Sequence, residues 1–169
     1  MSKRALTKYL AELKKKDLEA QLLDLYVRFP AVKEYYDFVF NPKEDKMVQE
    51  AKLKISNEYF PLKRKKPKAR RSVAQKFIKH FISLGVAPHL IVDVMLYNLE
   101  IAQSYSENRN VPDAFYKSME NSFKEAVQLV SVNGLLPDFK DRILKIYLFT
   151  TEHKWPNVEA FSRILDIID

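Results

Sequence analysis

The sequence predicts an all-α protein, a single domain of about eight or nine helices that spans residues 1–169. Apolar residues recur every three or four positions along nearly the whole chain, which is the spacing of one face of a helix. All eight prolines fall between the segments that carry this spacing. No segment shows the sustained alternation of apolar and polar residues that is typical of a strand. An apolar content of 47% is normal for a globular protein, so we expect these helices to share a core.

Four helices are expected in the first third of the chain. A leucine stripe marks the first helix, over residues 6–13. The second covers residues 18–29 and follows Asp17, a residue type that often caps a helix start. Residues 32–40 form a short third helix rich in aromatic residues. Residues 47–59 form a fourth helix, in which the apolar stripe is narrower.

The remaining helices have clear start and stop signals. Ser72 is the expected N-cap of the fifth helix, residues 73–84, and Gly85 is its expected left-handed C-cap. Gly134 ends a later helix in the same way. The last three helices begin alike, with a proline followed by Asp or Asn, as a first helical turn favours. The last four helices are expected at residues 88–105, 112–132, 137–152 and 156–168.

The helix over residues 88–105 is expected to be central, because it is apolar around most of its circumference. Short helices joined by tight turns allow two architectures: a compact multi-helix bundle or a short stack of helical hairpins. The prolines that start the last three helices are not evenly spaced, so a true repeat array is not indicated.

An aromatic cluster lies in the third expected helix, where the sequence reads YYDFVF. Its rings are Tyr35, Tyr36, Phe38 and Phe40. Four large rings in six residues are costly to leave in water, so we expect them to pack in the core. The alternative is an exposed patch that binds a partner or a second copy of the chain.

The net charge of +7 is concentrated in two places. Between Tyr59 and Val92 the chain carries nine Lys and Arg residues and no Asp or Glu. Between Lys3 and Lys16 it carries six basic residues against Glu12 alone. Local accumulation of one sign is what a surface for polyanions requires.

The longer of these two regions predicts a polyanion-binding surface at the connecting segment 61–71 and the helix that follows. Nucleic acid is the first candidate ligand, held by contacts to phosphates that are tolerant of sequence and sensitive to salt. Tyr59 and Phe60 are candidates to stack on bases, although aromatic residues at such a place often pack against a helix end. The predicted contact residues are Lys63, Arg64, Lys65, Lys66, Lys68, Arg70, Arg71, Lys76 and Lys79.

Two other interpretations remain open. The basic segment is also typical of a solvated linker between helices, in a protein that acts as a protein-interaction or scaffold module. An enzyme would need convergent polar groups, and His89, Asp93 and Glu100 share the one polar strip of the central helix. Such a strip is also the solvated side that a mostly buried helix needs.

Several kinds of chemistry are not indicated. With two glycines in the chain, neither a phosphate-binding P-loop nor a dinucleotide-binding turn can form. Without cysteine there is no thiolate nucleophile, disulfide or cysteine zinc site. We therefore expect a non-enzymatic protein without a cofactor. The apolar stretches are short and interrupted, so we expect no membrane span and a soluble, intracellular protein.

Three stretches resemble an uncharacterised family of small helical bacterial proteins: YYDFVFNPKED, KPKARRSVAQKFIKHFISLGVAPHLIVDVMLYNLEIAQ and AFYKSMENSFKEAV. The likeness runs from Tyr35 to at least Val127. The resemblance implies a bacterial, cytoplasmic protein of the all-helical class. It implies no activity, substrate or functional residue.

Overall fold

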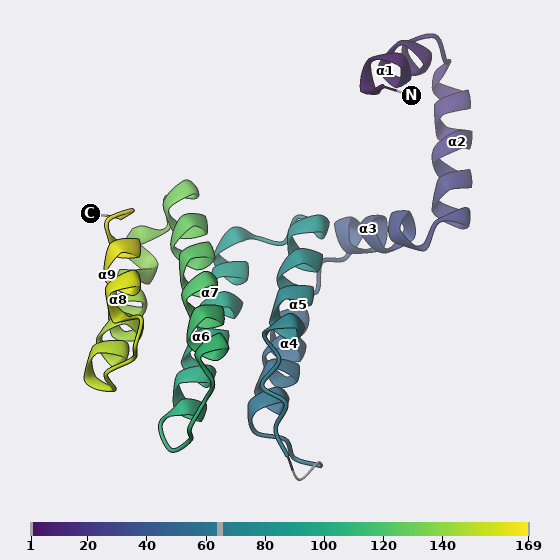
Figure 1. Cartoon of the computed structure of the whole chain (residues 1–169). Coiled ribbons are helices and arrows are strands. Elements are labelled where there is room, and N and C mark those ends of the chain that lie inside the picture. The colour runs from purple at the N-terminus through teal and green to yellow at the C-terminus, as the bar shows by residue number, and fades with distance from the viewer. Residues whose placement is uncertain (1, 64–65, 169) are drawn as a thin grey trace. The chain divides into compact units, whose positions relative to one another are not determined.

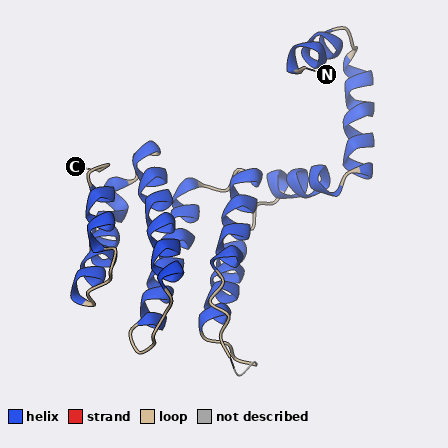
Figure 2. Ribbon diagram, in the orientation of Figure 1, coloured by secondary structure: helices blue, strands red, loops and turns tan. Residues whose placement is uncertain are grey.

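The computed structural model describes residues 2–63 and 66–168, in which the chain forms nine α-helices and no strand (Figure 2). The all-α prediction is confirmed. Contacts divide the chain into two compact units, residues 1–43 and residues 44–169. The prediction of one domain over residues 1–169 is not decided by this division and stays a prediction.

The first unit contains α1 (Lys3–Ala11), α2 (Lys15–Arg28) and α3 (Pro30–Phe40). Two side-chain hydrogen bonds join its helices. The Gln21 amide donates to the Tyr9 hydroxyl over 2.6 Å, which links α2 to α1. The Tyr26 hydroxyl donates to the Asp37 carboxylate over 2.7 Å, which links α2 to α3. No residue of these three helices is buried, so polar contacts and local helix propensity define the unit rather than a core.

The aromatic cluster of α3 is not packed in a core, contrary to the sequence prediction. Tyr36 contacts Tyr35 edge to face at 5.3 Å between ring centroids and stacks on Phe40 at 6.0 Å. Tyr35 is 44% exposed and Phe40 79% exposed. The reason is that the rings lie around more than one face of a short helix, and α2 covers only part of them.

The second unit is a short stack of three helical hairpins, one of the two predicted architectures (Figure 1). Consecutive helices pair in it, and α6 lies against α4 on one side and α8 on the other. Its six helices are α4 (Glu44–Tyr59), α5 (Arg71–Leu84), α6 (Pro88–Ser106), α7 (Asp113–Val132), α8 (Leu136–Glu152) and α9 (Val158–Leu165).

The core of this unit is centred on α6, as the sequence predicts. This helix contacts α4, α5, α7 and α8, and nine of its residues are buried. Val92, Leu96 and Leu99 are at most 1% exposed. Full burial of a side chain of this size contributes about 1.5–3 kcal/mol, so the buried residues of α6 contribute strongly to the stability of the stack.

The observed helix ends agree with the prediction at the two glycines, but two of the predicted N-caps differ from the observed ones. Gly85 and Gly134 have φ angles of 79° and 64°, a conformation that glycine adopts without strain. The expected N-caps Asp17 and Ser72 are wrong, because α2 and α5 begin earlier, at Lys15 and Arg71. Asp17 lies in the first turn of α2, where a carboxylate interacts favourably with the helix dipole.

Among the described residues, no helix combines the length and the apolar character that crossing a bilayer requires.

Candidate functional site: the basic segment

The basic segment, defined here as residues 60–70, connects α4 to α5 and is tied to the last turn of α4. The Asn57 side-chain oxygen accepts a hydrogen bond from the Leu62 N–H at 3.1 Å. The Glu58 carbonyl oxygen accepts from the N–H groups of Lys68 and Ala69 at 3.0 and 2.9 Å. The last carbonyls of a helix have no partner within the helix, so this segment satisfies one of them. Both ends of the basic segment are therefore held against the helix.

Arg70 forms a bidentate ion pair with Glu58. Its Nε and Nη2 atoms donate to the two carboxylate oxygens at 2.9 and 3.1 Å. The Glu58 side chain is 8% exposed. The hydrogen bonds that Arg70 donates to Glu58, and the negative charge of Glu58, raise the pKa of the Arg70 guanidinium. Glu58 thus binds the end of the basic segment through its backbone carbonyl and its side chain together.

Arg71 joins α5 to α7. Its Nε donates to the Ser122 hydroxyl at 2.6 Å, and its Nη2 donates to the Glu125 carboxylate at 2.8 Å. The other oxygen of Glu125 accepts from the Gln75 amide at 2.8 Å. Two of the three arginines predicted to bind phosphate, Arg70 and Arg71, are therefore engaged with carboxylates of their own chain, which the sequence prediction did not anticipate.

Five of the predicted lysines have a different environment. All five side chains are exposed, and no carboxylate of the described residues lies within 4.0 Å of their ammonium groups. Their positive charge is therefore not cancelled by a contact within this part of the chain. These lysines are Lys63, Lys66, Lys68, Lys76 and Lys79. The predicted contact residues Arg64 and Lys65 lie outside the described residues.

Two hollows flank the basic segment. One, of about 520 Å³, lies between α4 and α5. Its lining consists of three basic residues, Lys54, Lys63 and Arg70, together with Asn57, Glu58 and apolar side chains. The other, of about 320 Å³, is lined by Lys68 and by residues at the end of α6 and the start of α7, including Tyr105. Small-ligand sites commonly have volumes of this size, so a phosphate-bearing group can approach the lysines in either hollow.

Tyr59 and Phe60, where α4 meets the basic segment, differ in exposure. Tyr59 is 1% exposed, and burial raises the pKa of its hydroxyl. Its ring packs on Tyr105 with centroids 5.6 Å apart, so it cannot stack on a base. Phe60 is 38% exposed, and the Arg109 guanidinium lies 5.7 Å from the centre of its ring. Of the two candidates for base stacking, Phe60 alone reaches the surface.

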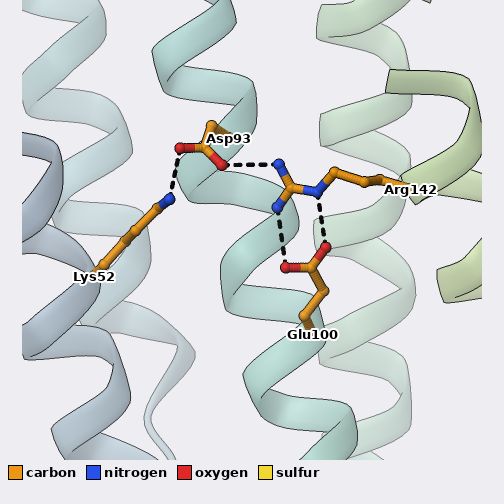
Figure 3. A network of polar contacts seen from close by, with 4 residues as sticks. All are labelled: Lys52, Asp93, Glu100 and Arg142. Carbon is orange, nitrogen blue, oxygen red and sulfur yellow. Dashed lines mark hydrogen bonds and ion pairs between the residues drawn. The ribbon is translucent and has the colours of Figure 1, made fainter. Parts of the chain in front are cut away.

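The polar strip of α6 forms a charge network rather than an open site (Figure 3). Asp93 accepts from Lys52 of α4 at 2.6 Å and from Arg142 of α8 at 2.8 Å. Arg142 also donates to both oxygens of Glu100 at 2.8 and 3.0 Å. Two cations and two carboxylates alternate along this network, so it joins the first helices of all three hairpins without net charge. His89 is exposed and takes no part in these contacts.

The network leaves no carboxylate free for metal binding or proton transfer. Burial acts to raise the pKa of Asp93, but the hydrogen bonds and charges of Lys52 and Arg142 outweigh it and lower that pKa. The Asp93 carboxylate is therefore a stable anion with two cationic partners, Lys52 and Arg142. Among the described residues, no cluster of three or more His, Asp or Glu side chains could hold a metal ion.

The sequence analysis did not predict the residues that bind Arg70, Arg71 and Asp93, which are Glu58, Glu125 and Arg142 respectively. Glu58 offered a signal, because it is the last carboxylate before the basic segment and stands at a helix end. Glu125 and Arg142 offered none. They lie 54 and 49 positions from the residues that they bind.

Comparison with known families adds one finding. The model of a family described as a family of unknown function, DUF6155, matches residues 1–169. The chain belongs to DUF6155. This confirms the resemblance to an uncharacterised helical family that three stretches of the sequence indicated. No curated protein and no solved structure matches the chain.

Proposed function

We propose that this DUF6155 chain is a non-enzymatic protein that binds a polyanion, in the first place a nucleic acid, along the basic segment and α5. One observation carries the proposal: five exposed lysines lie on the basic segment, which is held at both ends, and on α5, and none has a carboxylate partner among the described residues. Each ammonium group that is not paired with a carboxylate adds to the electrostatic attraction for phosphate. A segment whose two ends are already held loses less conformational entropy on binding.

The arginines have a supporting role in this proposal. Arg70 and Arg71 anchor the segment through Glu58 and Glu125, and the lysines make the contacts to phosphate. Lysine binds phosphate as a point charge without a fixed geometry, so the binding is expected to depend little on base sequence. A cytoplasmic location in a bacterium belongs to the same proposal, and the cysteine-free composition supports a reducing compartment.

The test is fluorescence anisotropy with a labelled single-stranded oligonucleotide and, in parallel, a duplex of the same length. If five lysines contact phosphates, the logarithm of the binding constant should fall with the logarithm of the salt concentration with a slope of about −4. The triple variant with Lys63, Lys66 and Lys68 replaced by Ala should bind at least tenfold more weakly and show a shallower slope.

A matched variant controls for net charge. Lys124, Lys140 and Lys145 are equally exposed lysines of α7 and α8, and their replacement by Ala removes the same three charges. This variant should bind like the wild type. An equal loss in both triple variants, or no salt-dependent binding by the wild type, would refute the proposed surface.

A further inference from the structure

The first unit has an apolar surface that nothing within the unit covers. Its helices have 9, 14 and 11 residues, lengths at which an isolated helix is marginal in water. Units of about 40 residues rarely bury enough surface to be stable by themselves. Twelve of its large apolar side chains are exposed: Leu6, Tyr9, Leu10, Leu18, Leu22, Leu23, Leu25, Val27, Phe29, Tyr35, Val39 and Phe40.

This surface includes a hollow between α2 and α3. The hollow has a volume of about 240 Å³ and is lined by Leu22, Leu23, Tyr26, Tyr36 and Phe40. The Tyr26 hydroxyl is already bonded to Asp37, so the lining offers aromatic and aliphatic carbon to a ligand. A space of this kind fits one or two apolar side chains rather than a charged group.

The charges of the unit are divided along its sequence. Residues 2–16 carry six basic residues and one acid, whereas residues 17–40 carry five acids and two basic residues. α1 and the start of α2 are therefore basic, and the rest of α2 together with α3 is acidic. Two such units placed in opposite directions would bring the basic part of each against the acidic part of the other.

We propose that a second copy of this chain covers this surface, so that the protein is a dimer joined through α1–α3. A two-fold dimer requires a surface that is complementary to itself, and the divided charge meets that requirement. The exposed parts of these twelve side chains, added together, amount to on the order of 1,000 Å² per copy, comparable with the roughly 800 Å² per partner that a standard interface buries. An anionic membrane fits less well, because it would repel the five acids of α2 and α3. This inference is independent of the polyanion surface in the second unit.

The experiment measures the mass of the full chain in solution by sedimentation equilibrium over a range of concentrations. The wild type should have about twice the monomer mass of 19.9 kDa. Leu23→Asp and Phe40→Asp each place a charge in the hollow and should halve the mass. Both side chains are more than half exposed, so these substitutions do not disturb a core.

Leu148→Asp is the matched control, because Leu148 of α8 is 51% exposed in the second unit. This variant should remain a dimer. A wild type that is monomeric at every concentration would overturn the proposal, and so would Leu23→Asp and Phe40→Asp variants that stay dimeric. A monomeric wild type that sediments with phosphatidylserine vesicles, when Phe40→Asp does not, would overturn it in favour of a membrane surface.

Discussion

At the residue scale, arginine and lysine have separate roles in this protein. Arg70, Arg71 and Arg142 each make two or more hydrogen bonds to side chains of other helices or of the preceding helix end. The planar guanidinium group suits such fixed, paired contacts, whereas the ammonium group of lysine is compact and strongly hydrated. In the basic segment and α5, the described arginines therefore hold the fold, and the described lysines remain available to a ligand.

Arg142 provides the first prediction at this scale. Arg142→Met keeps much of the side-chain length but removes three hydrogen bonds to Asp93 and Glu100. Because these groups are only partly buried, we expect a loss of about 1–2 kcal/mol in the free energy of unfolding. Urea denaturation measures this loss. Arg163→Met, an exposed position on α9, should change stability by less than about 0.5 kcal/mol. Equal effects of the two substitutions would contradict a structural role for the network.

At the element scale, the basic segment behaves as an extension of α4. Its end is bonded to the Glu58 carbonyl, and Ala69 adopts a positive φ of 47° to make that contact. A positive φ is unfavourable for alanine, so the hydrogen bonds of Glu58 must offset it. Glu58 therefore holds residues 68–70 through its backbone carbonyl and its carboxylate together.

Glu58 therefore controls access of proteases to the segment. Glu58→Gln removes the charge that holds Arg70 and should expose the peptide bonds after Lys68 and Arg70. Limited digestion with trypsin should cut there several times faster than in the wild type. Glu159→Gln removes one charge from an exposed position on α9 and serves as the control. Unchanged cleavage after Lys68 and Arg70 in Glu58→Gln would show that this end of the segment is held by other contacts.

At the scale of the whole molecule, the buried core and the apolar surface lie in different units. All the buried side chains of the described helices belong to α4–α9, whereas α1–α3 have none. The first unit is thus suited to association and the second to independent folding. A stack of hairpins gains its stability from contacts between neighbours, so it does not require an N-terminal unit.

The corresponding prediction concerns a shortened chain. A protein that begins at residue 44 should unfold cooperatively on heating, be monomeric, and bind the oligonucleotide with unchanged salt dependence. Circular dichroism, sedimentation and anisotropy measure the three properties. A shortened chain without a cooperative transition would show that the hairpin stack needs residues 1–43 to fold.

The sequence by itself determined the helices, the central place of α6 and the all-α class, because apolar spacing, prolines and glycines act within a few residues of each other. It also located the basic segment. Only the tertiary structure decided that Arg70 and Arg71 are engaged and that the α3 aromatic residues are exposed. A sequence pattern identifies a charged or apolar face, but whether a carboxylate or another helix covers that face depends on residues far away in the chain.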